Sequence, residues 1–250
     1  MQPLARRASE IFSDAAARLG QHAVDPAIPI LYFGDLTAYL RSPLRVVTVG
    51  LNPSRLEFPG DSPFRRFSNA ANLLPIRADT YDTYFDSLDN YFETDPYEDW
   101  FKSFNSVLCP LTASFWPGCT NFVIHTDICS PVATDRGWNK LPPWAKAHLL
   151  EKGPGLWRDL IALLKPHILL APVRGEYLLK AGLPDVRSWT TLYDCECHPS
   201  KTARFMYAQL SPDQKSLVIH GPCFNKPFLP FGRTDKQKIG GRILTEYGRA

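Results

Sequence analysis

The sequence predicts an α/β fold of three layers (α/β/α), in which helices cover both faces of a central, mostly parallel sheet of four strands. Four apolar, β-branched stretches have the length of buried strands. Segments with helical periodicity separate them, which is typical of parallel strands joined by crossover helices. The 250 residues contain neither an internal repeat nor a linker-like segment. We therefore expect one domain over 1–250, with residues 1–43 as an N-terminal helical extension.

The first half of the chain is expected to be largely helical around a single strand. Apolar residues at helical spacing predict a helix over 5–19. Two aromatic stripes predict helix over 76–108, with the aromatic rings in the core. Between these helices we expect an extended, proline-containing connector over 21–33, a short helix over 32–40 and the first strand over 45–50.

The second half alternates strands and helices. Gly153-Pro154-Gly155 is expected to break one helical stretch into two, because glycine and proline disfavour helix interiors. Lys165-Pro166 leads into the third strand, and Gly182 closes a short helix. The predicted segments are strand 120–128, helices 141–150 and 156–164, strand 167–171, helix 176–181, short strand candidates 190–193 and 205–208, strand 216–219 and helix 234–247.

Composition excludes some classes of protein. The net charge of +3 permits nucleic-acid binding without arguing for it, and no apolar run approaches the length of a membrane span. The first twenty residues lack the apolar core of a signal peptide, so we expect a cytoplasmic protein whose six cysteines are reduced thiols. Cys195-Glu196-Cys197-His198 does not match the usual metal-binding spacings. We expect neither metal nor cofactor.

The first strand ends in a polar turn, Gly50-Leu51-Asn52-Pro53-Ser54. Ligands of open α/β sheets bind just beyond the carboxyl ends of strands, so Asn52 is a candidate site residue. Gly50 allows a sharp turn or close approach to a ligand. The irregular stretch 55–72 follows, and so long a loop is often functional. Within it, Phe64 either seals the core or offers a stacking surface, and Arg65-Arg66 favours a phosphate-bearing partner unless both are simply solvated.

Two other strands also end in polar residues. His125-Thr126-Asp127 closes the second strand, where these side chains either contact a ligand or serve the fold. His220-Gly221-Pro222-Cys223-Phe224-Asn225 follows the last strand. The segment from Lys226 to Ala250 contains six basic and two acidic residues, and its net charge of +4 exceeds the +3 of the whole chain. This stretch is either a nucleic-acid-binding rim or a solvated helix face.

These motifs resemble those of the uracil-DNA glycosylase superfamily, most closely its mismatch-specific and single-strand-selective branches. Gly50 to Ser54, with Pro63-Phe64 after it, resembles the first motif, and His220 to Asn225 resembles the second. Order and spacing agree over about residues 44–245. The chain departs from the family pattern at Ser54, at Gly221-Pro222 and in lacking an asparagine at the end of the second strand. His198-Pro199-Ser200 matches the second motif better by letters, but no apolar strand leads into it, so we favour His220.

The resemblance implies a monofunctional DNA glycosylase of base-excision DNA repair, which flips a uracil or another deaminated base out of single- or double-stranded DNA and hydrolyses its N-glycosidic bond. Asn52 would hold the attacking water, and a neutral His220 would stabilise the leaving base. Asp127 would act as an ionised acceptor, which suits a base that offers donors. The other implied substrate contacts are Gly50, Leu51, Phe64, His125 and Asn225. The implied DNA contacts are Ser54, Arg65, Arg66, the wedge Phe224, Lys226 and Arg233.

Two other functions stay open. The departures from the family motifs are compatible with a catalytically inactive nucleic-acid-binding protein on the same fold. A nucleoside or nucleotide N-glycosidase would use the same site residues without needing DNA. In each case we expect a monomer that has no membrane association.

Overall fold

The computed structural model describes residues 1–195 and 201–249, so the alternative motif at His198 lies outside the described residues. The chain divides into two compact units, and each is assembled from three separate segments. Unit 1 contains Met1–Asp35, Gly50–Tyr97 and His125–Leu160, and unit 2 contains Leu36–Val49, Glu98–Ile124 and Ile161–Ala250. The single domain over 1–250 stays a prediction, and residues 1–43 contribute to both units.

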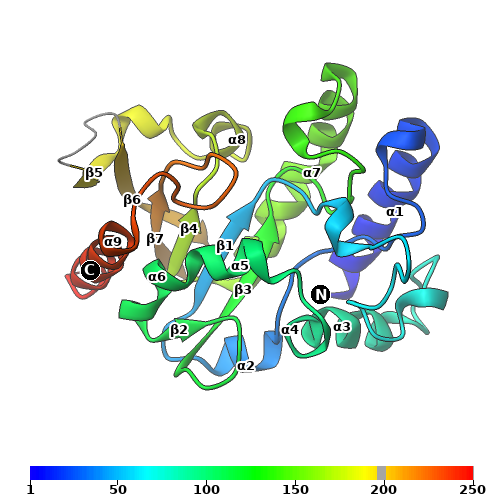
Figure 1. Cartoon of the computed structure of the whole chain (residues 1–250), viewed down its shortest axis with the longest axis horizontal. Coiled ribbons are helices and arrows are strands. Elements are labelled where there is room, and N and C mark those ends of the chain that lie inside the picture. Colours follow the sequence, from blue (N-terminus) through cyan, green and yellow to red (C-terminus); the bar gives the residue numbers. More distant parts are fainter. Residues whose placement is uncertain (196–200, 250) are drawn as a thin grey trace. The chain divides into compact units, whose positions relative to one another are not determined.

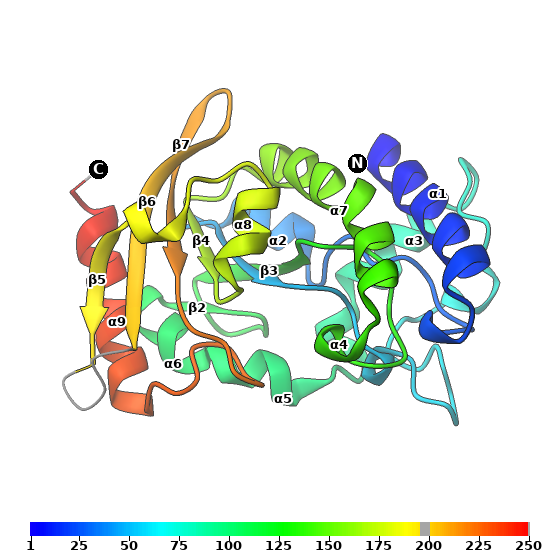
Figure 2. The same ribbon diagram turned by 90° about the horizontal axis from the view of Figure 1, so that it is seen from above.

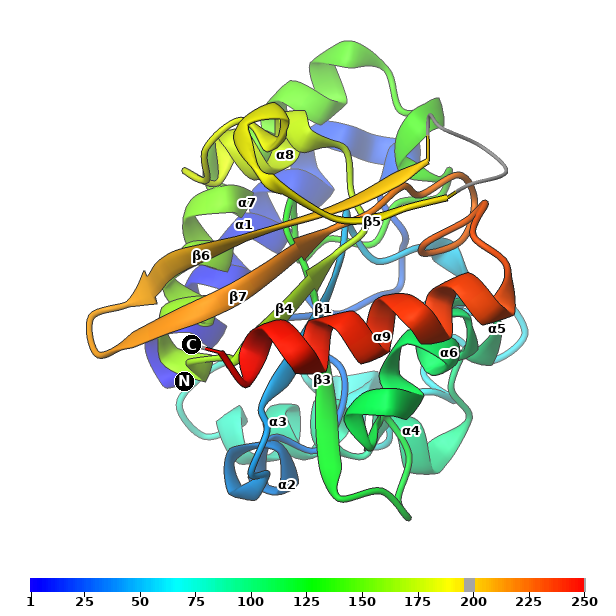
Figure 3. The ribbon, with the colours of Figure 1, turned by 90° about the vertical axis from the view of Figure 1, so that its left-hand side faces the viewer.

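One mixed sheet of seven strands, among the described residues, confirms the α/β class (Figure 3). Its spatial order is β2-β3-β1-β4-β7-β6-β5. The strands are β1 (Val46–Gly50), β2 (Ala113–Ser114), β3 (Asn121–Asp127), β4 (Ile168–Ala171), β5 (Thr190–Asp194), β6 (Thr202–Ser211) and β7 (Gln214–His220). Only the last residues of β1 and β3 belong to unit 1, and the remainder of the sheet belongs to unit 2.

The centre of the sheet is parallel and one edge of it is antiparallel. β4 pairs in parallel with β1 on one side and with β7 on the other, and Leu170 is in register with Thr48 and Ile219. β6 runs antiparallel to both β7 and β5. The β6–β7 hairpin extends well beyond the neighbouring strands (Figure 2). The short strand candidates in this region were therefore correct in position, although β6 is longer than its predicted 205–208.

Unit 2 surrounds its sheet with α2 (Leu36–Arg41), α5 (Glu98–Phe101), α6 (Asn105–Leu108), α8 (Gly175–Lys180) and α9 (Arg233–Tyr247). α9 lies beside α6 (Figure 1). Gly240 allows this close approach, because a Cβ there would lie 2.9 Å from Pro110 Cγ and even closer to the carbonyl of Val107. α9 confirms the predicted C-terminal helix.

Unit 1 contains α1 (Gln2–Leu19), α3 (Tyr81–Asp89), α4 (Tyr91–Thr94) and most of α7 (Pro143–Leu164). α1 and α7 lie side by side (Figure 2), joined by an ion pair between Arg7 and Asp159 and by a contact of 3.5 Å between Asp14 and His148. α1 confirms the helix predicted at the N-terminus. No helix among the described residues is long and apolar enough to cross a membrane.

Two predictions about helices were wrong. α7 continues through Gly153-Pro154-Gly155, where a break was expected. Gly153 lies against the backbone of Cys129, a contact that leaves no room for a side chain, and the buried Trp157 anchors the turn that follows. The expected helix over 76–108 is instead divided into α3, α4, α5, α6 and a short 3₁₀ turn. Its aromatic stripes do form core, as predicted, since Tyr84 and Phe104 are fully buried.

Candidate functional site

The loop after β1, Gly50–Ser54, is attached to the chain that leaves β3. Ile128 N donates to Gly50 O at 3.0 Å, and Cys129 N donates to Leu51 O at 2.8 Å. A Cβ on Gly50 would lie 2.9 Å from His125 Nε2 and overlap Asp127 Oδ1. Gly50 is therefore required here because the side chains of His125 and Asp127 occupy the space beside it.

Asn52 is held by its amide nitrogen. Nδ2 donates to Pro53 O at 2.7 Å, to Thr134 Oγ1 at 2.9 Å and to Val132 O at 3.3 Å. Oδ1 accepts no hydrogen bond from any described residue, and the side chain is half-buried. The amide is thus fixed with its donors facing protein and its acceptor facing solvent, which is the orientation needed to hold a water molecule by its oxygen.

Ser54 caps the short 3₁₀ turn that follows the loop. Its Oγ accepts a hydrogen bond of 3.2 Å from Leu56 N, and its backbone bridges to Thr134. The serine therefore closes the turn through its own side chain. Leu51 and Ser54 are both half-buried.

Phe64 is the outermost ring of an aromatic cluster in unit 1. Phe58 and Phe67 are buried and stacked with centroids 5.2 Å apart. Phe64 meets the Phe58 ring edge-on at 6.2 Å and stays half-buried. The buried rings fix one side of Phe64, so the ring is positioned by the core without being enclosed in it.

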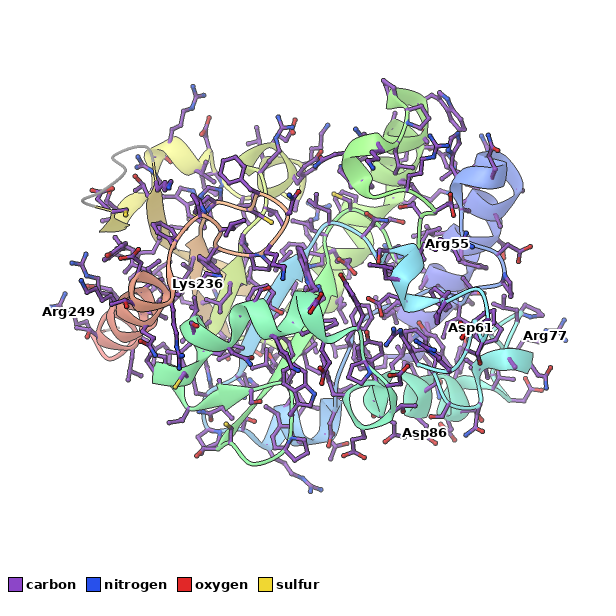
Figure 4. All side chains as sticks on the ribbon, viewed as in Figure 1. Arg55, Asp61, Arg77, Asp86, Lys236 and Arg249 are labelled. Carbon is purple, nitrogen blue, oxygen red and sulfur yellow. The ribbon has the colours of Figure 1, made fainter. Side chains whose placement is uncertain are left out.

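The two adjacent arginines differ in exposure, but both are engaged by neighbouring acidic residues. Arg65 is exposed and contacts Asp95 at 2.9 Å and Asp61 at 3.5 Å, the latter labelled in Figure 4. Arg66 is buried, donates from Nε to Leu56 O at 3.0 Å and also bonds the backbone of Asp95. Arg66 therefore stabilises the long loop through contacts within the protein.

A buried group of ionisable side chains lies behind the Gly50 loop, and the sequence reading missed part of it. Glu57 is 5% exposed and accepts a hydrogen bond from Tyr91 Oη, which in turn accepts one of 2.9 Å from Tyr97 N. Burial raises the pKa of Glu57 to about 7, although Tyr91 and Arg66 oppose the rise. The sequence did contain a signal for this buried carboxyl, because Glu57 stands between two apolar residues, Leu56 and Phe58, five residues after Asn52.

His125 and Asp127 at the end of β3 belong to the same buried group. Their side chains are 3% and 5% exposed, and Nε2 lies 3.8 Å from Oδ1. Burial lowers the pKa of His125 to about 3, so the imidazole is neutral. Burial and the nearby Glu57 raise the pKa of Asp127 well above its ordinary value. This raised pKa runs against the expectation of an always-ionised acceptor at Asp127, because the carboxyl is withdrawn from water.

In unit 2, β7 ends at His220, which is half-buried and lies opposite Ala171 of β4. Its ring meets Trp189 edge-on at 6.2 Å. Nδ1 is buried and has no hydrogen-bond partner among the described residues. Burial lowers the pKa of His220, with Arg204 acting in the same direction and the backbone of Val173 against it. The imidazole is therefore neutral at pH 7, the form in which one ring nitrogen can donate.

The loop after His220 folds back on a buried phenylalanine. Phe228 is fully buried under Gly221, where a Cβ would lie 2.5 Å from Phe228 Cδ1. Lys236 on α9 reaches inward and donates to Pro227 O at 2.8 Å and to Ser103 O at 3.1 Å (Figure 4). This packing explains why glycine stands at 221. It also leaves the tip of the loop in solvent.

Phe224 is that tip, with 65% of its surface exposed. The backbone bridge between Cys223 and Pro227 narrows the loop on either side of Phe224. Asn225, Lys226 and Arg233 are exposed as well. An apolar ring held in water by a fixed loop is available to contact a partner.

Among the described residues, no three His, Cys, Asp or Glu side chains gather in a way that could hold a metal ion. The structure brings Gly50, Asn52, His125 and Asp127 together within unit 1, and it places His220 and Phe224 on one loop of unit 2. The chain matches no model of a known protein family and no curated protein.

Proposed function

We propose that the protein is a monofunctional DNA glycosylase, which hydrolyses the N-glycosidic bond of uracil or another deaminated base. The fold proposed with it is that of the uracil-DNA glycosylases, with β3, β1, β4 and β7 as a mostly parallel core. One observation carries the proposal: β1 and β7 flank β4 in parallel and in register. Parallel strands end at the same edge of a sheet, which supports a proposal in which residues that follow β1 and β7 act on one substrate.

Asn52 would supply the water that attacks C1′ of the sugar. Its three donor contacts support this role, because they leave the carbonyl oxygen as the acceptor for a water proton. An amide is not a base, so it positions water without deprotonating it effectively. The bond between C1′ and the base nitrogen breaks with its electron pair on the base, and the water oxygen then joins C1′.

His220 would stabilise the departing base. The negative charge that develops on the base oxygen needs a fixed donor, and a placed donor of this kind is worth roughly 3–4 kcal/mol. The lowered pKa of His220 supports a neutral imidazole in this role. A neutral donor also avoids binding the ground-state base too tightly.

Two phenylalanines would serve base flipping. Phe64, held edge-on by Phe58, offers a face on which the extruded base can stack. Phe224 is exposed on its narrowed loop and would fill the gap left in the base stack, a known use of apolar wedges. We propose a cytoplasmic monomer that needs no cofactor for this chemistry.

The experiment is a single-turnover assay with a labelled single-stranded oligonucleotide that contains one uracil, followed by alkali cleavage. Asn52→Ala and His220→Ala should each lower the rate at least ~100-fold. Asn72→Ala and His22→Ala are matched controls outside the proposed site and should keep the wild-type rate. Absence of cleavage with uracil, hypoxanthine and xanthine, in single and double strands, would refute the enzyme proposal. DNA binding without base release would favour the inactive binding protein.

A nucleoside or nucleotide N-glycosidase is the second candidate. It is favoured by the contacts of Arg65 and Arg66 with acidic neighbours, since these two of the cations expected to meet DNA phosphates are already paired within unit 1. An enzyme for free nucleosides needs fewer phosphate contacts than one that grips a strand. Release of base from deoxyuridine at a rate comparable to that from the oligonucleotide would select this candidate.

A further inference from the structure

The carboxyl of Asp127 is almost fully buried and forms no hydrogen bond with any described residue. Its side chain is 5% exposed, and the nearby His125 Nε2, at 3.8 Å, is beyond hydrogen-bond distance. Its oxygens are not among the fully buried side-chain atoms that lack a partner, so the carboxyl keeps a small accessible surface. The carboxyl also lies beside Gly50, at the start of the loop that carries Asn52.

A second buried carboxyl, that of Glu57, acts on Asp127 electrostatically. The groups around the pair do not cancel two negative charges. Tyr91 donates only a hydroxyl to Glu57, and His125 is neutral. The cation that acts on Glu57 among the described residues is Arg66, and its guanidinium is also bound to the backbone and carboxylate of Asp95. Two carboxyls in such a place cannot both ionise easily, so a proton stays on the pair.

We propose that Asp127 reads the substrate base as a neutral carboxylic acid, and that Glu57 is the positioning residue that keeps it neutral. This inference rests on the proposed glycosylase function and deepens it. A neutral carboxyl presents one donor beside one acceptor, whereas a carboxylate presents acceptors only. The site would therefore take a base whose edge carries one donor beside one acceptor, such as N3–H and O4 of uracil.

The geometry also gives Gly50 a role in this recognition. Its missing side chain lets the Asp127 carboxyl and His125 Nε2 lie against the backbone of the Asn52 loop. The group that reads the base and the group that holds the water would then be fixed to one loop of unit 1. Recognition of the correct base by Asp127 would therefore also position the water held by Asn52.

The test uses the full-length protein and has two readouts. Infrared difference spectra of wild type minus Asp127→Asn at pH 7 should contain the carbonyl band of a neutral carboxylic acid. The rate of uracil release from a single-stranded oligonucleotide should fall at alkaline pH as Asp127 loses its proton. We call this fall in rate at alkaline pH the alkaline limb. Glu57→Gln removes the neighbouring charge, so the midpoint of the alkaline limb should move to lower pH by about one unit.

Controls separate recognition from folding. Glu98→Gln makes the same change at an exposed glutamate and should leave the alkaline limb in place. Asp127→Asn keeps a donor beside an acceptor without an ionisable group, so its profile should be flat in the alkaline range. The rate of Asp127→Asn should exceed that of Asp127→Ala at least ~10-fold, because alanine cannot form hydrogen bonds with the edge of the base.

The outcomes distinguish this inference from the proposed function. A wild type that releases no base defeats the glycosylase proposal, and with it the substrate assignment. Base release by a wild type that lacks the neutral-acid band overturns only the inference. So does an alkaline limb that Glu57→Gln leaves unmoved while its melting shows a folded protein. If Glu57→Gln does not fold, the infrared band and the comparison of Asp127→Asn with Asp127→Ala still decide.

Discussion

Replacing Asn52 by aspartate is expected to harm this protein, although a carboxylate is the better base for activating water. The structure gives the reason, since Nδ2 donates to the carbonyls of Pro53 and Val132 and to the hydroxyl of Thr134. In Asn52→Asp an oxygen replaces that nitrogen and faces two carbonyl oxygens. The Thr134 hydroxyl cannot compensate easily, because it already donates to Arg136 O at 2.8 Å.

The loss can be estimated from these contacts. Each carbonyl left without its donor costs about 1–3 kcal/mol when buried. Water reaches part of this half-buried site, so we expect a total of about 2–3 kcal/mol. For a chain of this length, 1 kcal/mol lowers Tm by roughly 2–4 °C, so Tm should fall by about 5–10 °C.

The loss should also depend on pH. The new carboxyl faces acceptors and no cation, so its pKa in the folded state rises above the ordinary value of roughly 3.9. A raised carboxyl pKa stabilises the fold fully below that ordinary value, and the contribution disappears as pH rises through the folded pKa. The Tm difference from wild type should therefore be larger at pH 8 than at pH 5.

Differential scanning fluorimetry at both pH values checks this expectation, alongside single-turnover base release. Asn72→Asp is the matched control, since it introduces the same charge at an exposed asparagine. Its Tm should stay within about 1 °C of wild type at both pH values. An Asn52→Asp protein that melts like wild type and releases base faster would refute the reasoning, because Nδ2 would then not be what holds this side chain.

Three further outcomes are expected. Gly221→Ala forces a methyl group against Phe228 and should lower the free energy of unfolding, measured by urea titration, by about 1–3 kcal/mol. Gly241→Ala is the control, because open space surrounds that position, and it should raise the free energy of unfolding by up to about 1 kcal/mol. Because the pKa of Glu57 is raised to about 7, its contribution is complete at low pH and is lost as pH rises towards 7; Glu57→Gln should remove about 3 kcal/mol of that pH dependence in urea titrations at pH 4.5 and 7.5. Phe224→Ala, at an exposed ring, should leave Tm unchanged but slow base release at least ~10-fold more in double-stranded than in single-stranded DNA, which parallel kinetics would measure.

Strong periodicity predicted most elements of the fold well. It failed for α7 and β6, whose extent depends on contacts with other segments of the chain. The helix at the N-terminus and the strands β1, β3, β4 and β7 follow from apolar patterns that local sequence reveals. The continuity of α7 does not, because it depends on Gly153 meeting the Cys129 backbone from another segment. Nor does the full ten-residue length of β6, because that depends on pairing with β7 from Arg204 to Ser211 and with β5 at Thr202 and Ala203.

The candidate site was predictable by position more than by chemistry. The rule that ligands bind at strand ends was enough to select Asn52 and His220. The raised pKa of Asp127 was not predictable, because it depends on burial and on Glu57, which lies 70 residues away in sequence. The structural role of Arg66 was equally hidden, since sequence cannot tell a solvated arginine from one that bonds the backbone of Asp95.

The number of exposed, unpaired basic residues between Lys226 and Ala250 limits how strongly this protein would bind DNA. The net +4 from Lys226 to Ala250 overstates the cations available for phosphates. Lys236 is buried, Arg242 donates to Leu192 O at 2.7 Å, and Arg249, labelled in Figure 4, pairs with Glu246. The exposed cations of that stretch that enter no ion pair with a described residue are Lys226, Arg233 and Lys238. Three phosphate contacts give weak, modestly salt-dependent binding, so capture of the flipped base would have to supply much of the affinity.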